Sequence, residues 1–172
     1  MGHEPEDVRQ IVLTHCHGDH TGRAKAVQDA TGAPVVAGAA DVAVIEGKAP
    51  YPGPKGAMRP LYGWFGGFAR LSVDHPVTDR EEIEGGLVIV PAPGHTLGHV
   101  AVLAPDHGAL FAADAVWHLG PATQSWRPFT ADPALNDESV RHLATLRAPR
   151  VLPSHGPDIS GERLAALASS SR

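Results

Sequence analysis

The chain has 172 residues, a length typical of one domain with a hydrophobic core, so we expect a single domain over residues 1–172. Charged residues make up 19% of the chain and the formal net charge is −5, which does not indicate a nucleic-acid-binding surface. The apolar runs are too short to cross a bilayer, and the first residues lack the apolar segment of a signal peptide. The single cysteine cannot form an internal disulfide. We therefore expect a cytoplasmic protein.

Short strands and helices alternate in the first part of the sequence. Runs rich in β-branched residues predict strands over residues 8–13 and 34–37, and alanine-rich segments predict helices over residues 21–30 and 39–46. Residues 48–60 contain several prolines and glycines and are expected to form a loop. An irregular helix is predicted over residues 61–71.

The second part favours strands separated by Pro and Gly. Strands are predicted over residues 87–90, 99–104 and 109–113, with a hairpin turn at residues 105–108. Asp132 and Pro133 are typical of a helix start, and that helix is expected to end near Arg147. The last strand is predicted over residues 151–153, and a closing helix over residues 161–169. The order indicates a mixed fold of class α/β (α+β) whose sheet faces are covered by helices.

Metal-binding side chains are concentrated directly after the first predicted strand. Three histidines and one aspartate lie within six residues, and no ordinary core or surface needs that concentration: His15, His17, Asp19 and His20. Further residues of the same types follow later apolar runs: His95, Asp114 and His155. Imidazole nitrogens and carboxylate oxygens are the ligands of catalytic zinc. The seven residues therefore predict a site for two metal ions.

The spacing agrees with two neighbouring ions. Residues i and i+2 of a strand share a face, so His15 and His17 can point the same way. Gly18 allows the chain to turn and to aim Asp19 at a second ion. Two ions about 3.5–4 Å apart need a bridging group, and Asp114 is the natural candidate.

The other residues of these types are interpreted as structural or solvated. Cys16 lies between two predicted ligands, so its side chain is expected to point away from them into the core. His99 opens a predicted strand and is interpreted as structural. The remaining histidines are interpreted as solvated: His3, His75, His107 and His142.

The sequence resembles the metallo-β-lactamase superfamily in four motifs, which are T-H-C-H-G-D-H-T-G, P-G-H-T-L-G-H, F-A-A-D and S-H-G-P. The resemblance implies an αββα sandwich in which one ion is held by His15, His17 and His95. It implies a second ion held by Asp19, His20 and His155, with Asp114 bridging. True zinc β-lactamases often have a cysteine near the Asp114 position, so the chain is more similar to the glyoxalase II, lactonase and general hydrolase branches.

The chemistry implied is hydrolysis of a small ester, thioester or lactone by metal-bound hydroxide, since a Lewis-acidic ion lowers the pKa of its water toward ~7. Asp19 is expected to act as the catalytic residue that accepts the proton of the water and delivers it to the leaving group. Zinc is the first candidate for both ions, and iron and manganese suit the same ligands.

Two features depart from the family. Only thirteen residues precede Thr14, whereas the resemblance implies several strands there and an acidic residue next to the ligands, so we expect a sandwich that is incomplete in its N-terminal half. Three alternatives follow: a shortened chain with a vacant sheet edge, a homodimer in which one copy covers the edge of the other, or a catalytically silent metal-binding scaffold that functions as an oligomer. Ala113 stands where the family more often has glycine, and it fits if the backbone there stays in the β region.

Aromatic residues in two segments are candidates for contact with a small-molecule substrate. The candidates are Trp64 and Phe65 in the first segment, and Trp117 and His118 in the second. The alternative is that the aromatic side chains only pack the loops onto the sheets. The sequence shows no C-terminal cluster of Lys and Arg of the kind expected for glutathione binding. It also shows no appended basic domain of the kind expected for an RNA substrate.

Overall fold

The computed structural model describes residues 4–51, 69–121 and 123–170. The regular elements include five α-helices, with these bounds: α1 (Gly18–Thr21), α2 (Ala24–Thr31), α3 (Ala39–Ile45), α5 (Pro133–Thr145) and α6 (Gly161–Ser170). The strands are β1 (Ile11–Leu13), β2 (Val35–Gly38), β3 (His75–Val77), β4 (Glu81–Ile83), β5 (Leu87–Pro91), β6 (Val100–Ala104), β7 (Ala109–Ala113), β8 (Val116–Trp117), β9 (Thr123–Gln124), β10 (Arg150–Pro153) and β11 (Ile159–Ser160). Short 3₁₀ turns lie at Pro5–Asp7, Pro105–His107 and Arg127–Phe129.

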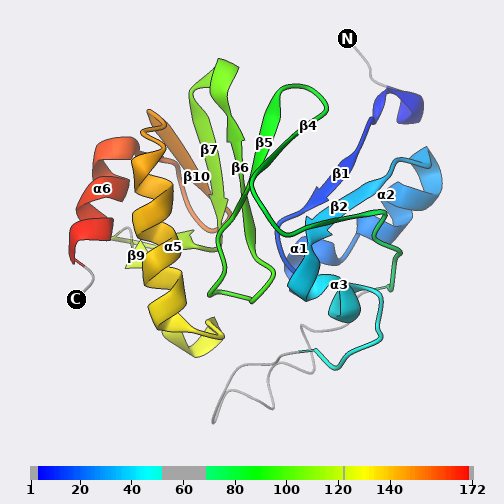
Figure 1. Ribbon diagram of the computed structural model, residues 1–172, viewed down its shortest axis with the longest axis horizontal. Helices are drawn as coiled ribbons and strands as arrows, with labels where there is room; N and C mark the ends of the chain where they lie inside the picture. The colour runs from blue at the N-terminus through cyan, green and yellow to red at the C-terminus, as the bar shows by residue number, and fades with distance from the viewer. Residues whose placement is uncertain (1–3, 52–68, 122, 171–172) are drawn as a thin grey trace.

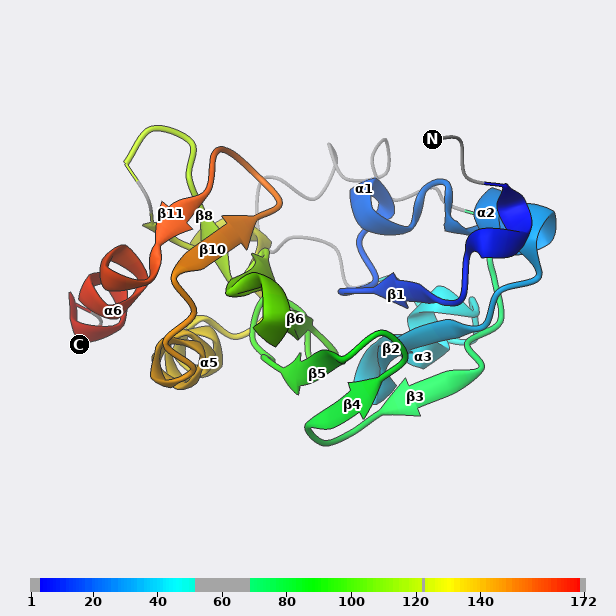
Figure 2. The ribbon, with the colours of Figure 1, turned by 90° about the horizontal axis from the view of Figure 1, so that it is seen from above.

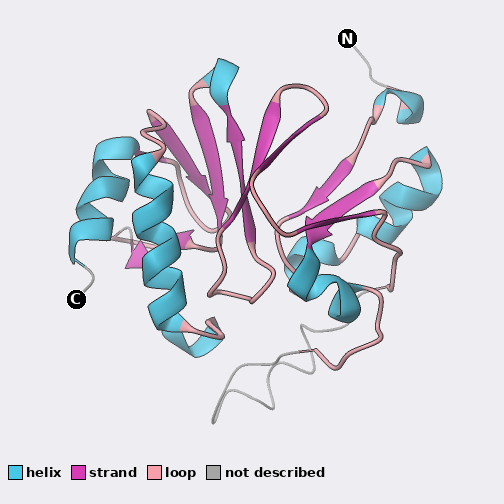
Figure 3. Ribbon diagram, viewed as in Figure 1, coloured by secondary structure: helices cyan, strands magenta, loops and turns pink. Residues whose placement is uncertain are grey.

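The elements form four layers. A parallel three-stranded sheet in the order β1-β2-β3 faces a six-stranded sheet in the order β11-β10-β7-β6-β5-β4. Helices α1, α2 and α3 lie beside the smaller sheet, and α5 and α6 cover the outer face of the larger one (Figures 1 and 3). Seen from above, β3 and β4 lie where the two sheets approach each other (Figure 2). The mixed α/β class and the expected αββα order of layers are therefore confirmed.

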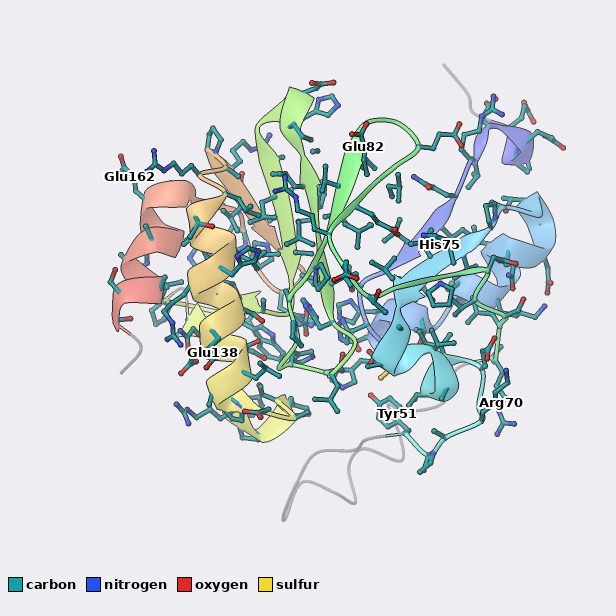
Figure 4. All side chains as sticks on the ribbon, in the orientation of Figure 1. Tyr51, Arg70, His75, Glu82, Glu138 and Glu162 are labelled. Atoms are coloured by element: carbon teal, nitrogen blue, oxygen red, sulfur yellow. The ribbon has the colours of Figure 1, made fainter. Side chains whose placement is uncertain are left out.

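Three apolar clusters hold the layers together. Leu13 and Ile45 belong to the cluster between the smaller sheet and its helices, and Val36 and Ile89 to the cluster between the two sheets. The third cluster lies between the larger sheet and α5 and α6, and it includes Leu143. The charged side chains of these two helices point outward, as Glu138 and Glu162 show in Figure 4. Each sheet thus uses one face for a helix layer and the other for the opposite sheet.

Most predicted elements are present, with ends shifted by a few residues. Asp132 caps α5 as expected, since its side chain accepts hydrogen bonds from the backbone N–H groups of Ala134 and Leu135. Five short strands were not predicted, namely β3, β4, β8, β9 and β11, because two or three residues carry no alternation that a sequence can display. The predicted helix over residues 61–71 falls mostly outside the described residues. None of the described helices is long and apolar enough to span a membrane.

Helix α5 ends at Thr145, near Arg147 as expected, and Arg147 itself adopts a left-handed conformation with φ of 54°. Two expectations about the backbone were wrong. The strand β10 is followed by one more strand, β11, which pairs with it antiparallel. Ala113 has φ of 45°, outside the β region, where the register between β7 and β10 is irregular. An L-residue in this conformation is strained, so the backbone just before Asp114 is held by its surroundings.

Candidate metal centre

The first group of predicted ligands lies where β1 ends. Strand β1 is followed by a loop and then by the short helix α1, which places Asp19 and His20 one after the other in its first turn. The Thr21 hydroxyl donates to the His17 carbonyl over 2.9 Å and closes this turn. The backbone N–H of Val100 at the start of β6 donates to the Thr14 carbonyl over 2.8 Å. The cluster therefore lies at the junction of the two sheets.

The second group comes from the larger sheet. His95 lies between β5 and β6, Asp114 follows β7, and His155 follows β10. All three follow strands of the same sheet and meet the cluster from β1 at one edge. The structure thus brings together all seven side chains that the sequence singled out.

Asp114 lies at the centre of the constellation. Its Oδ2 is 3.4 Å from Nε2 of His95 and 3.3 Å from Nε2 of His155, and its Oδ1 is 3.4 Å from Nε2 of His20. Its position between ligands from both halves fits a bridging carboxylate. Three overlapping groups have ligand atoms within 4.8 Å of one another: His15, His17 and His95; His15, His20 and Asp114; and Asp19, His20 and His155.

The first of these groups is buried. Nδ1 of His17 and Nε2 of His95 are 2.8 Å apart, and His15 is fully enclosed. Burial is the largest cause that lowers the pKa of all three imidazoles, to about 4 for His17 and well below the usual range for His15 and His95. These rings are therefore neutral at pH 7 and present lone pairs, which is the state that metal binding requires. We call His15, His17 and His95 the buried group.

Two residues in the second half of the constellation are open to solvent. The side chain of Asp19 is 58% exposed and that of His155 is 30% exposed. The neighbouring His20 imidazole, whose Nε2 is 3.5 Å from Oδ2 of Asp19, lowers the pKa of Asp19 to about 2, so this carboxylate is ionised at neutral pH. A hydrogen bond with Asp114 raises the pKa of His155. We call Asp19, His20 and His155 the open group.

Several buried polar atoms at the centre fit a metal ion. Among the described residues, Nε2 of His15, Nε2 of His20 and Oδ1 of Asp114 are buried without a hydrogen-bond partner. Native structures rarely leave such atoms unsatisfied, so a group that they could bind is expected between them. The donors are imidazole nitrogens and carboxylate oxygens, which suit zinc and similar divalent ions.

The buried ligands are oriented from behind by neighbouring side chains. Nδ1 of His95 is 2.7 Å from the Ser125 hydroxyl, which leaves Nε2 to face the centre. His99 lies behind Asp114, because its Nε2 accepts the backbone N–H of Asp114 over 3.2 Å and its Nδ1 donates to the Ala92 carbonyl. The structural role predicted for His99 is confirmed. Ser125 was not singled out from the sequence, because nothing near it in the chain relates it to His95.

Cys16 lies between two ligands but belongs to the core. Its side chain is completely buried in the cluster formed with Leu13 and Ile45. Burial, with the nearby Asp41 carboxylate as a second cause, raises the pKa of the Cys16 thiol. The thiol therefore stays protonated and packs away from the site, as its position in the sequence predicted.

A cavity of about 290 Å³ opens onto the centre. Its polar wall includes His17, Asp19, His95, Asp114 and His155, and its aromatic wall consists of Tyr51, Trp117 and Phe129. Tyr51 lies on the segment after α3 (Figure 4), with its ring centroid 5.6 Å from that of His17. The ring of Trp117 lies 4.5 Å from that of His155, centroid to centroid. An apolar portion of a substrate would find contacts on this wall.

The four candidate substrate contacts differ in where they lie relative to the cavity. Trp117 lines the cavity, whereas His118 is not among the residues that line it, and its Nδ1 is 2.9 Å from the Pro157 carbonyl. Trp64 and Phe65 lie outside the described residues. Phe129 was not singled out, since it lies 15 residues past Asp114 and reaches the cavity only because the chain folds back after β9.

A family model described as the metallo-beta-lactamase superfamily matches residues 2–155. The chain belongs to the metallo-beta-lactamase superfamily. The superfamily predicted from the four motifs is thus confirmed.

Relatives of known name indicate the branch. The chain is 30% identical over 142 residues to the hydroxyacylglutathione hydrolase of Rhodobacter capsulatus, an alignment that covers 81% of this chain and 44% of the relative. Hydroxyacylglutathione hydrolase is glyoxalase II, so the predicted similarity to that branch is confirmed. The chain spans less than half the length of the curated relatives it matches.

Solved structures agree with the fold. A metallo-beta-lactamase from Pontibacter korlensis superposes with a TM-score of 0.70 at 22% identity, covering 95% of this chain and 70% of that one. A protein solved as TTHA1623 in a di-iron-bound form gives a TM-score of 0.66 at 26% identity, covering 94% of this chain and 74% of that one.

Proposed function

We propose that the chain is a hydrolase with a dinuclear metal centre that cleaves a small ester, thioester or lactone. The observation that carries the proposal is the position of Asp114, whose carboxylate lies 3.3–3.4 Å from three imidazole nitrogens at the floor of an aromatic-walled cavity. The similarity to hydroxyacylglutathione hydrolases, whose name denotes a thioester substrate, supports the same class of reaction.

The ligands would be shared between two ions. The buried group would hold one ion, the open group the other, and Asp114 would contact both. Divalent ions supply a water of lowered pKa and polarise the substrate carbonyl. Iron suits the same donors, and the di-iron form of a structural neighbour supports it as the alternative to zinc, with manganese as a third candidate.

Asp19 is proposed as the residue that moves the proton. Its carboxylate lines the cavity, is more than half exposed, and is ionised at neutral pH because its pKa is lowered to about 2. It can therefore accept the proton of the attacking water and return it to the leaving alkoxide or thiolate. Trp117 and Phe129 would hold the apolar part of the substrate and exclude water from it.

A substrate panel with one variant tests the proposal. The purified chain is stripped with a chelator, reloaded with zinc, iron or manganese, and assayed on simple esters, simple thioesters, lactones and a glutathione thioester. We expect two ions per chain and turnover that disappears in Asp19→Ala. Asp29→Ala, an exposed aspartate on α2, should leave turnover unchanged. Turnover retained in Asp19→Ala would refute the role of Asp19, and two bound ions without turnover would favour the silent scaffold.

Further properties belong to the same proposal. Residues 1–172 would act as one domain on a small-molecule substrate in the cytoplasm. Strand β1 is at the edge of its sheet, with no described strand on its outer side, and Phe111 on β7 is 44% exposed. A second copy that pairs at this edge would cover both features. The molecular mass in solution tests this: a dimer supports the pairing, and a monomer at micromolar concentration refutes it.

A further inference from the structure

Asp41 is a buried carboxylate that belongs to none of the ligand groups and does not line the cavity. It lies in the first turn of α3 with a relative exposure of 3%. We propose that Asp41 is a positioning residue of the metal centre: it ties the His15–His17 segment to the His95 loop and so fixes the buried group without binding the ion. The inference rests on the proposed metal centre and assigns a role to a residue outside it.

The Asp41 carboxylate links two segments that are about 80 residues apart in the sequence. Oδ2 accepts the backbone N–H of Cys16 over 2.9 Å, and Cys16 lies between His15 and His17. The same oxygen accepts the Thr96 hydroxyl over 2.6 Å, and Thr96 directly follows His95. All three residues of the buried group therefore lie next to a residue that Asp41 holds.

A third hydrogen bond fixes the far end of the His95 loop. Oδ1 of Asp41 accepts the backbone N–H of Gly98 over 2.8 Å. The two chain segments are in close contact there, since a Cβ on Gly98 would lie 2.4 Å from the backbone nitrogen of Asp41 and 2.7 Å from its Cγ. The loop thus packs directly against the carboxylate, and Asp41 cannot move without moving it.

Only a carboxylate satisfies this arrangement. Three donors converge on two oxygens, and an ionised carboxylate has acceptor sites for all of them. An asparagine of the same shape has one oxygen and an NH₂ group. In either orientation of the amide, the NH₂ would face one backbone N–H, that of Cys16 or that of Gly98, and leave that donor buried without an acceptor. Asp41→Asn therefore breaks the link to either the His15–His17 segment or the His95 loop and preserves the volume of the side chain.

Metal titration tests the inference with a readout that does not depend on turnover. Cobalt(II) is added to the metal-free chain while its ligand-field absorption is recorded, and affinities come from competition with a chelator. In a His155→Ala background, which weakens the open group, we expect Asp41→Asn to reduce cobalt affinity about 10–100-fold, as loss of a residue that orients ligands does. The absorption bands should also change, because the ligand geometry changes.

Three further variants keep the test independent of stability. Thr96→Val removes one of the three hydrogen bonds and should weaken binding by a smaller factor, and Thr96→Ser retains the hydroxyl and should restore the parent affinity and spectrum. Asp74→Asn is the matched control, because the Asp74 carboxylate also accepts a backbone N–H, that of Val35 over 2.9 Å, and is not among the residues grouped as ligands. We expect it to lower the melting temperature without changing cobalt affinity.

The outcomes separate the two proposals. A folded Asp41→Asn variant with parent affinity and spectrum overturns the positioning role, as does an equal loss in Asp74→Asn. If Asp41→Asn does not fold, the comparison of Thr96→Val with Thr96→Ser decides, and equal affinities overturn the role. A parent chain that binds no cobalt refutes the metal centre itself, and with it the inference.

Discussion

The two halves of the candidate centre differ in how their ligands are held. In the buried group, His15 is enclosed and His95 forms a hydrogen bond with Ser125. Asp41 joins the His15–His17 segment to the His95 loop. In the open group, Asp19 is 58% exposed and lies on the cavity wall. Under the proposed function the two groups would have different roles: the buried group would retain an ion, and the open group would contact substrate and exchange protons.

Asp114 lies between the buried group and the open group, so replacing it should have the largest effect. Asp114→Asn keeps the shape of the side chain but removes the charge between three imidazoles. We expect neither ion to bind tightly and kcat/KM to fall by at least about a hundredfold. Metal content after dialysis and steady-state kinetics measure both effects. Retention of two ions at parent affinity would contradict the bridging position.

Ligand variants in the two halves should have different consequences. His95→Ala removes a buried ligand and leaves the Ser125 hydroxyl facing a cavity, so we expect loss of metal together with a lower melting temperature. His155→Ala removes a partly exposed ligand and should retain one ion and nearly the parent melting temperature. Elemental analysis and thermal unfolding of the two proteins, side by side, check the contrast. Equal destabilisation by both variants would refute it.

The pH dependence of the metal-free chain should follow the buried histidines. Burial lowers the pKa of His17 and His99 to about 4, whereas both titrate near ~6.5 in the unfolded chain. Between these pH values the unfolded state binds more protons than the folded state. The contribution of these two histidines to the free energy of unfolding is therefore complete above pH ~6.5 and is lost as the pH falls toward 4. His155 has a raised pKa and opposes this trend, since its contribution is present at low pH and is lost as the pH rises.

Thermal unfolding of the chelated protein between pH 5 and 8 measures the balance. We expect the melting temperature to decrease on acidification, and to decrease more steeply in His155→Ala, which lacks the opposing contribution. A melting temperature that is constant or rises toward pH 5 would show that the buried rings do not dominate.

The smallest effect is expected from the backbone beside Asp114. Ala113 has φ of 45°, and a residue without Cβ relieves the strain of that conformation. Ala113→Gly should therefore increase the free energy of unfolding by about 1 kcal/mol. Ala112→Gly is the matched control, since Ala112 is a buried strand residue whose change to glycine should destabilise by about 0.5–1 kcal/mol. Denaturant titrations compare them, and the same sign for both would contradict the strain.

The sequence predicted the features that depend on residue type and local order. The His15–His20 cluster follows directly on a strand, and few residue types bind metals, so a metal-binding role could be predicted from the sequence alone. The positions that came from tertiary contacts were not predictable. The left-handed backbone of Ala113 arises from the register between β7 and β10, and no neighbour in the chain indicates it.

Asp41 shows that a sequence can indicate a buried role for a residue without indicating its partners. It lies four residues before Ile45, and both side chains are buried on one face of α3. A carboxylate on the apolar side of a short helix indicates a buried hydrogen-bonding role, but not which segments it joins. Only the packing of α3 against the His95 loop identifies the partners.

The candidate ligands follow the ends of strands in two separate sheets, which has a consequence for the lifetime of the protein. Ions held by His15 at one sheet and by His95 and His155 at the other would act as non-covalent cross-links between distant parts of the chain. Each tenfold rise in free metal above the dissociation constant would then add about 1.4 kcal/mol per ion to folding stability. At low free metal the unfolded fraction would rise, and proteolysis of that fraction would lower the abundance of the chain.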